Sequence, residues 1–363
     1  MSLALQILAI ALGLLMVQSV LRDAFETVVL PRRPSQRRRI TILYYRLTWP
    51  PVRRIVGRLS QTSADTLLNY FGPLWMLGLI SFWAALLILA FALINWGAGS
   101  PYHVAVGVTP TFLWDLYVSG TTLFTLGMGD VYPISTAARV IAVLEAGVGL
   151  ALLALVIGYV PVLYSAFSRR EVMISLLDAR AGSPPTAIEL LRRGFDGVDA
   201  APLTAMLVEF EHWGAELLEV YLSYPVLMYY RAQHDRQSWL AALVAVADAC
   251  ALLLAVRDPR LERQARFTFA VLRHLLVDVT PYMSIEPHPP HVPRVTGDGY
   301  AALEDRLTAI GVQIADRDAF APALRETLDS YEALANGIGE WLLTPMPALA
   351  PATVMEDDWQ VGA

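Results

Sequence analysis

A short glycine-containing string near the middle of the chain has the residue types needed to bind a dehydrated cation. Residues 125–130 read Thr-Leu-Gly-Met-Gly-Asp. Rings of peptide carbonyl oxygens can replace the hydration shell of an ion, and glycine can turn alternate carbonyls toward one axis because it adopts a positive φ without steric cost. The pattern predicts an ion-binding segment made by the backbone of Thr125, Leu126, Gly127, Met128 and Gly129, with the Thr125 hydroxyl as its innermost ring. The alternative interpretation is a glycine-rich external turn between two helices.

Three apolar stretches are long enough to cross a bilayer, which takes about 20 residues. They cover residues 3–21, 71–96 and 137–167, so the string at 125–130 lies between the second and the third. The first stretch could be a signal peptide, but its basic cluster follows it instead of preceding it, which favours a retained anchor. The chain is 56% hydrophobic and 17% charged, a balance that also indicates a membrane protein.

The segment before the string is predicted to be a short helix over residues 111–124, with a start signal at Thr109-Pro110-Thr111. A helix of this length cannot span the membrane, so it must re-enter it. Irregular backbone at membrane depth is tolerated where it is buried in protein or lines water. The carboxyl end of the helix would direct partial negative charge toward a cavity, which favours cations.

The string in this setting resembles the pore region of the potassium channel superfamily, whose filter usually reads Thr-Val-Gly-Tyr-Gly-Asp. The resemblance covers about residues 68–170. It implies that K⁺ is the permeant ion, that residues 125–130 form the selectivity filter, and that Asp130 lies at the outer mouth. Each chain carries one filter string and a closed cage needs four, so the resemblance also implies a homotetramer. No cofactor is expected beside the permeant ion.

Met128 departs from the superfamily pattern, in which a tyrosine usually stands at that position. That side chain packs behind the filter in relatives, and methionine is more flexible than tyrosine. We expect selective K⁺ conduction, with weakly selective cation conduction as the alternative. A second departure is Thr121, because some relatives carry an acid four residues before the filter threonine. Glu145 on the third span could supply this carboxyl instead, so Thr121 and Glu145 are expected to support the filter.

The third span is expected to line the inner pore. Gly147 and Gly149 lie in the middle of this span, where relatives often bend, although close packing of helices would explain them equally well. Tyr159 and Pro161 lie near its cytoplasmic end, and proline removes one helix hydrogen bond. The sequence leaves open whether these residues form a hinge and a gate or serve only packing and a kink.

Charge is distributed unevenly along the chain. Residues 22–58 include ten arginines and two acidic residues, whereas residues 97–110 include no Lys, Arg, Asp or Glu. The positive-inside rule then predicts a multi-pass protein of the plasma (inner) membrane, with its N-terminus outside and its C-terminal part in the cytoplasm. The arginine-rich linker could also bind anionic lipids, although its role as a topology signal would be enough to explain it.

After residue 168 the pattern changes to amphipathic helices. We expect helices at 184–194, 201–222, 236–256, 259–279, 299–314 and 318–343, and an extended proline-rich linker at 281–293. Ser183-Pro184 is interpreted as the start signal of the first of these helices. This part has neither a Gly-x-Gly-x-x-Gly turn nor alternating strands and helices, so we do not expect a nucleotide-binding domain. We expect no nucleic-acid partner.

Few residues of the C-terminal part could do chemistry. Glu209, His212 and Glu216 share one face of a predicted helix, and His288 and His291 flank a pair of prolines. Either group could bind a metal ion, although a solvated surface is the commoner reason for such residues. We do not expect an enzyme. A non-conducting, membrane-anchored regulatory or signalling protein is the remaining alternative to a channel.

The fold class predicted from these features is an all-α membrane protein with an extra N-terminal span. The expected domains are an N-terminal transmembrane helix (1–22), a basic linker (23–67), a two-span pore module with a re-entrant helix and filter (68–168), a helical cytosolic domain (169–344) and a disordered acidic tail (345–363).

Overall fold

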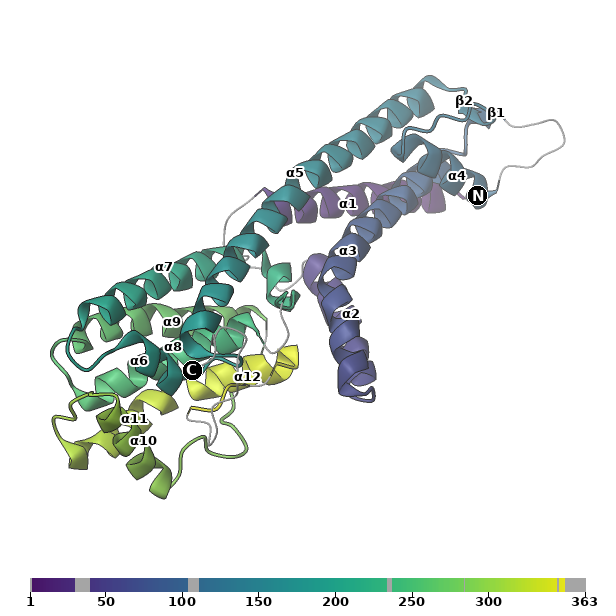
Figure 1. The fold of residues 1–363 in the computed structure, drawn as a ribbon. Helices are drawn as coiled ribbons and strands as arrows, with labels where there is room; N and C mark the ends of the chain where they lie inside the picture. The colour runs from purple at the N-terminus through teal and green to yellow at the C-terminus, as the bar shows by residue number, and fades with distance from the viewer. Residues whose placement is uncertain are drawn as a thin grey trace. The chain divides into compact units, whose positions relative to one another are not determined.

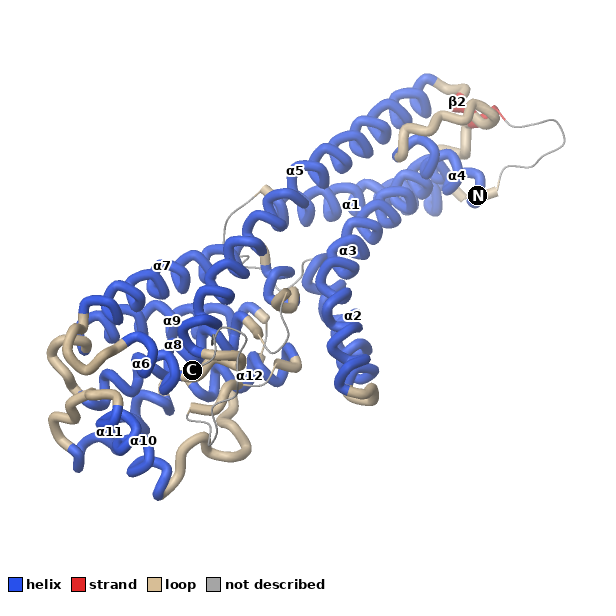
Figure 2. The backbone as a smooth tube through the Cα atoms, in the orientation of Figure 1, coloured by secondary structure: helices blue, strands red, loops and turns tan. Residues whose placement is uncertain are grey.

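The computed structural model describes residues 2–29, 40–103, 111–233, 237–283, 285–344 and 346–349. Helices dominate these residues, and a short antiparallel ribbon pairs β1 (Tyr102–His103) with β2 (Tyr132–Pro133) (Figure 2). The chain divides into two compact units, Met1–Tyr164 and Ser165–Ala363. Most of the predicted tail (345 and 350–363), Thr109 and Pro110 of the start signal, and part of the arginine-rich linker lie outside the described residues.

Three helices of the described chain contain the predicted spans, which confirms an all-α membrane protein. They are α1 (Leu3–Val28), α3 (Gln61–Gly97) and α5 (Thr136–Ala181), and each is long and apolar enough to cross a membrane. All three run further than expected. α1 ends at Val28 instead of near residue 21, and α3 begins at Gln61, ten residues before the predicted start at 71. α5 continues to Ala181, well past the predicted end at residue 167.

α1 and α3 pack side by side because glycine lets their backbones approach closely (Figure 1). A Cβ placed on Gly13 of α1 would lie 2.6 Å from the carbonyl oxygen of Ala90 in α3, closer than real Cβ atoms come. Small residues allow the same close approach in other membrane helix pairs. Val20 and Leu87 belong to the apolar core at this contact.

α2 (Ile40–Val56) occupies the second half of the predicted linker and is held by a carboxylate of α1. Asp23 Oδ2 accepts hydrogen bonds from the Thr41 amide (3.0 Å), the Thr41 hydroxyl (2.6 Å) and the indole N–H of Trp83 in α3 (2.9 Å). The first bond satisfies an amide in the first turn of α2, where helix N–H groups lack partners and negative charge is favourable. The buried Asp23 side chain therefore connects α1, α2 and α3 by hydrogen bonds.

α4 (Phe112–Leu123) is the predicted short helix, and it packs against α3. Its 12 residues reach about 18 Å at the usual rise per residue, well short of the ~30 Å hydrocarbon core of a bilayer. Thr111 occupies the N-cap position but makes no side-chain capping bond. The chain then passes through residues 124–131 and β2 into α5.

The second unit is helical. Beyond the last part of α5 it contains α6 (Ala187–Gly194), α7 (Ala201–Ser223), η1 (Pro225–Tyr229), α8 (Trp239–Val256), α9 (Glu262–Tyr282), α10 (Asp298–Ala309), α11 (Arg317–Asp329) and α12 (Glu332–Leu342). α8 is apolar enough to cross a membrane, but 94% of it is buried inside the protein. The expectation of an amphipathic helix here is therefore wrong: α8 is apolar on all sides because protein surrounds it.

Two helix predictions fail at their boundaries. The helix expected at 318–343 is interrupted between α11 and α12, because the Tyr331 ring is fully buried and its hydroxyl donates to the Asp248 carboxylate of α8. The other failure concerns α6, which begins at Ala187 and not at the expected Pro184. Its cap is Thr186, whose hydroxyl accepts a hydrogen bond from the Glu189 amide.

Candidate functional site

The backbone of the glycine-containing string alternates in conformation. Thr125, Gly127 and Gly129 have φ values of +56°, +53° and +78°, whereas Leu126 and Met128 do not have a positive φ. Glycine adopts this region freely, and a threonine adopts it only with support from its surroundings. Alternation of this kind turns successive peptide planes. The role of these carbonyls as ion ligands stays a prediction.

Thr121 supports the string through its main chain. Its carbonyl oxygen accepts hydrogen bonds from the Leu126 amide (2.8 Å) and the Gly127 amide (3.4 Å). Its hydroxyl instead donates to the Val118 carbonyl within α4 (3.0 Å). The carboxyl end of α4 therefore holds the first residues of the string directly, without a side-chain acid at this position.

Asp130 is braced by the short helix. The Tyr117 hydroxyl donates a hydrogen bond of 2.8 Å to Asp130 Oδ2. The sequence analysis placed Asp130 at the outer mouth and did not single out Tyr117. The contact joins the middle of α4 to the residue that follows Gly129, so both ends of the string are tied to the same helix.

Glu145 contacts the short helix from α5. The Ser119 hydroxyl lies within hydrogen-bond distance of the Glu145 carboxyl and also lies 2.9 Å from the carbonyl oxygen of Ile88 in α3. Ser119 is fully buried, and Glu145 is 1% exposed. Ser119 was missed by sequence analysis, because a small polar residue in a short helix gives no distinct signal.

Asp115 is a second buried acid of α4 that the sequence analysis did not single out. Its side chain is fully buried, and its Oδ2 accepts a hydrogen bond of 2.9 Å from the Ser100 hydroxyl. The buried Tyr102 hydroxyl interacts electrostatically with the same carboxylate. Asp115 lies one helical turn before Ser119, so the two polar residues share a face of the helix.

The two glycines of the third span have different surroundings. A Cβ on Gly149 would lie 1.9 Å from the carbonyl oxygen of Leu123, whereas a Cβ on Gly147 would meet nothing within 4 Å. Gly149 therefore permits α5 to touch the last turn of α4. Further along α5, Tyr159 is 7% exposed and Pro161 lies inside the helix. Their roles in gating stay predictions.

The acidic residues proposed as metal ligands in the second unit have arginine partners. Glu209 pairs with Arg180 at 2.9 Å, and Glu216 pairs with Arg169 at 2.5 Å. No group of three or more His, Cys, Asp or Glu side chains is arranged to hold a metal ion among the residues that the structure describes. On the helix face shared with His212, Glu209 and Glu216 thus each form an ion pair with an arginine.

The two histidines of the proline-rich segment approach one carboxylate. His288 Nε2 lies 3.0 Å and His291 Nε2 lies 3.8 Å from the oxygens of Glu340 in α12. The carbonyl oxygen of Glu286 and then the Glu340 carboxylate raise the pKa of His288. Conversely, the hydrogen bond from His288 is the main reason that the pKa of Glu340 is lowered. The contacts of His288 and His291 with Glu340 therefore attach the proline-rich segment to α12, and the attachment depends on the protonation of His288.

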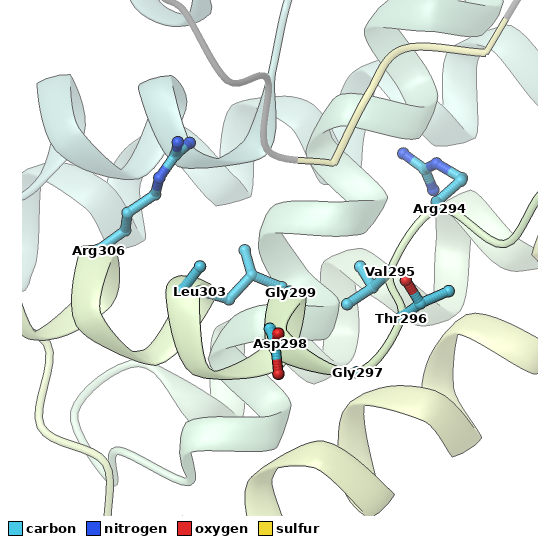
Figure 3. Close-up of a pocket in the computed structure, with 9 residues that line it drawn as sticks. Arg294, Val295, Thr296, Gly297, Asp298, Gly299, Leu303 and Arg306 are labelled. Carbon is cyan, nitrogen blue, oxygen red and sulfur yellow. The ribbon is translucent and has the colours of Figure 1, made fainter.

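A surface pocket of about 590 Å³ lies at the start of α10 in the second unit. Figure 3 shows Arg294 and Arg306 at opposite ends of the residues that line it. Arg294 already donates to Asp248 (2.9 Å) and to Glu332 (3.1 Å). Its charge is therefore compensated within the protein, and the pocket defines no ligand class.

The first unit thus combines helices long and apolar enough to cross a membrane, a 12-residue helix between two of them, and a string of alternating backbone after that short helix. Residues 76–165 match the family model described as "Ion channel". This match supports a pore unit of the potassium channel superfamily, and it covers α4, residues 125–130 and most of the two helices that flank them. No curated protein and no solved structure matches the chain.

Proposed function

We propose that the chain is one subunit of a potassium-selective channel of the plasma membrane that assembles as a homotetramer. The observation that carries this proposal is the alternation of φ at Thr125, Gly127 and Gly129 directly after α4, inside the segment that matches the ion channel family. Four such backbones around one axis would stack rings of carbonyl oxygens that replace the hydration shell of K⁺. Asp130 would add a ring of negative charge at the outer mouth.

Exposed apolar side chains in the first unit support assembly around an axis. Val143, Leu144 and Ile157 of α5 are 72%, 62% and 65% exposed in the single subunit, and the filter side chains of Leu126 and Met128 are 63% and 68% exposed. Only 6% of the apolar part of α5 is buried within the chain. Lipid and neighbouring subunits together would cover these surfaces, and a ring of four subunits would cover those nearest the filter.

The proposed orientation follows the charge distribution. With the N-terminus outside, α1 crosses inward, α2 lies at the cytoplasmic surface, α3 crosses outward and α5 returns, so that the second unit is cytoplasmic. In this arrangement Tyr159 and Pro161 lie toward the cytoplasmic end of the pore, where an apolar constriction could gate by dewetting. We assign no enzymatic activity to the chain.

The proposal includes anionic lipids as partners of α2. One face of this helix packs on α3 through aromatic rings, including Tyr45 tilted against Trp75 at 4.0 Å between centroids. The other face exposes Leu43 and Leu47 (53% and 63%) together with Arg54. Leucines beside an arginine suit the headgroup layer, where the apolar side chains enter the lipid and the guanidinium group meets phosphate.

The decisive experiment is flux through the purified full-length protein in liposomes. We expect K⁺ flux that Ba²⁺ blocks, and a reversal potential that follows the K⁺ gradient; a reversal potential midway between those of K⁺ and Na⁺ would establish the weakly selective alternative that Met128 suggests. A folded tetramer without any flux would instead indicate the non-conducting alternative, and a monomer would overturn the proposal.

A matched pair of glycine variants tests whether residues 125–129 carry the ions. Gly127 and Gly99 both have a positive φ (+53° and +89°), and a Cβ on either would meet nothing within 4 Å. Alanine at each position therefore suffers a similar backbone strain of roughly 1–2 kcal/mol. Gly127→Ala should abolish K⁺ flux or selectivity, whereas Gly99→Ala should conduct normally. Equal loss in both variants would indicate general destabilisation.

A further inference from the structure

A buried acid of the first unit has no positively charged partner. Glu145 is 1% exposed within a single subunit, so neighbouring subunits cannot provide its solvation. No Lys or Arg occurs between Arg58 and Arg139 in the sequence. An isolated ionised carboxylate is very costly to bury, and such groups are normally paired or neutralised.

The groups that face Glu145 are all neutral or acidic. α4 presents Ser119, whose hydroxyl also contacts the Ile88 carbonyl of α3, while Tyr102 of β1 lies within electrostatic reach of both Glu145 and Asp115 of α4.

Two basic side chains of the helices in the same unit have other partners. Arg139 of α5 donates to the Pro133 carbonyl at 3.3 Å, and Arg22 of α1 pairs with Glu26 at 2.7 Å. His103 stacks on the Tyr132 ring. No ion pair to Glu145 exists within the part of the chain that the structure describes.

Hydrogen-bond counting favours a protonated Glu145. The Ser119 hydroxyl has one hydrogen but lies within bonding distance of two oxygens, one from the Ile88 carbonyl and one from the Glu145 carboxyl. A peptide carbonyl can only accept, so both contacts are hydrogen bonds at the same time only when Ser119 donates to Ile88 and accepts from Glu145. The contact with Glu145 is then a hydrogen bond only if the carboxyl brings its own hydrogen.

We propose that Glu145 is held as an uncharged carboxylic acid that donates to Ser119, and that this relay to the Ile88 carbonyl positions α4 between α3 and α5. This inference rests on the proposed channel function, because Ser119 lies two residues before Thr121, whose carbonyl holds the amides of Leu126 and Gly127. Glu145 is thus a positioning residue for the filter. Gly149, one turn later in α5, lets the same helix face touch Leu123.

Infrared spectroscopy of the full-length protein in lipid at neutral pH tests the protonation directly. The carbonyl stretch of a protonated carboxyl is separate from the carboxylate bands, and it shifts in D₂O. Glu145→Gln should lose such a band relative to the wild-type protein. Asp65→Asn, which removes an exposed acid of α3, should lose only carboxylate intensity. Identical protonated-carboxyl bands in the wild-type protein and in Glu145→Gln would overturn the proposal.

K⁺ flux in liposomes tests the positioning role. Glu145→Ala and Ser119→Ala each break the relay and should lower flux by about tenfold, the factor set by one unmade buried hydrogen bond. Glu145→Gln keeps both a hydrogen-bond donor and an acceptor, so its flux should match that of the wild-type protein at neutral pH. The wild-type protein should lose flux at alkaline pH, where Glu145 ionises, and Glu145→Gln should not. Flux in Glu145→Gln as low as in Glu145→Ala would overturn the relay. If the wild-type protein does not conduct, the channel proposal fails, and the infrared result still decides the state of Glu145.

Discussion

Tyr117 and Asp130 are joined by a hydrogen bond of 2.8 Å, which ties the middle of α4 to the residue after the last glycine of the string. The first residues of the string are held by the Thr121 carbonyl at the end of the same helix. Residues 125–129 are therefore suspended between two attachments to α4. Their geometry depends on where α4 is placed, and α4 in turn is placed by α3 and α5.

Loss of the Tyr117 hydroxyl should weaken the outer attachment. We expect Tyr117→Phe to conduct but to lose activity faster during sustained flux, because the bond contributes about 0.5–1.5 kcal/mol, or roughly a two- to tenfold change in the population of the intact filter. Single-channel recordings would measure the rate at which activity is lost. Tyr70→Phe, which removes an exposed hydroxyl of α3, is the control and should behave as the wild-type protein.

The two glycines of α5 should respond differently to alanine. Gly149→Ala places a methyl group 1.9 Å from the Leu123 carbonyl oxygen, whereas Gly147→Ala meets open space. We expect Gly149→Ala to lower the midpoint of thermal unfolding and to abolish K⁺ flux, because backbone must move to make room. Gly147→Ala should fold normally. Unchanged stability of Gly149→Ala would show that α5 does not pack against α4 as described.

The buried ion pair of the second unit should be costly to break from one side. Arg294 donates both terminal nitrogens to the Asp248 carboxylate, and both side chains are almost fully buried. Asp248→Asn should destabilise the protein by up to about 3–5 kcal/mol, since it removes one of the two carboxylates that pair with the buried Arg294 and leaves Glu332 alone to balance the charge. Arg266→Gln breaks an exposed pair with Glu262 and should cost less than about 1 kcal/mol. Chemical unfolding of the full chain measures both.

The contact between His288 and Glu340 predicts a modest pH dependence of stability. The raised pKa of His288 contributes stability that is complete below its ordinary value of 6.5 and is lost as the pH rises through the folded value. The lowered pKa of Glu340 contributes stability that is complete above its ordinary value of 4.5 and is lost as the pH falls through the folded value. The pair should therefore stabilise the protein most between about pH 4.5 and 6.5.

Unfolding of the full chain as a function of pH measures this effect. Glu340→Gln should lower the free energy of unfolding by less than about 1 kcal/mol, because the pair is exposed, and the difference from the wild-type protein should be largest inside that pH range. His212→Gln removes a histidine of the same unit and serves as the control. A difference that does not change between pH 4 and pH 9 would contradict the prediction.

Binding of anionic lipid should depend on the exposed arginines in the last turn of α2 and directly after it, Arg54 and Arg58. Arg54→Gln combined with Arg58→Gln should reduce the anionic lipids retained by the purified protein, at about 1 kcal/mol for each arginine near the membrane surface. Native mass spectrometry would count the retained lipids. Arg325→Gln removes an exposed arginine of α11 and should have no effect. Equal lipid retention in all variants would leave α2 with a topological role only.

The sequence was sufficient for the features that rest on local rules. The positive φ of Gly127 and Gly129 follows from the residue type, and the three membrane helices follow from uninterrupted apolar length. Contacts between distant segments were not predictable. Ser119 acquires its importance from Ile88 and Glu145, which lie 31 and 26 residues away. The break between α11 and α12 exists because Tyr331 reaches Asp248, 83 residues away, and no local signal overrides the helical pattern there.

The hydrogen bonds to the Asp23 carboxylate make the first unit depend on α1 after membrane insertion. Proteolytic removal of α1 would strip the buried Trp83 indole of its acceptor and leave the first turn of α2 uncapped. Such a cut would remove the acceptor of three donors of the remaining chain, in a region with little water to replace it. α1 is therefore expected to stay with the mature channel as a structural component, and a signal peptidase that recognised it would damage the protein instead of completing it.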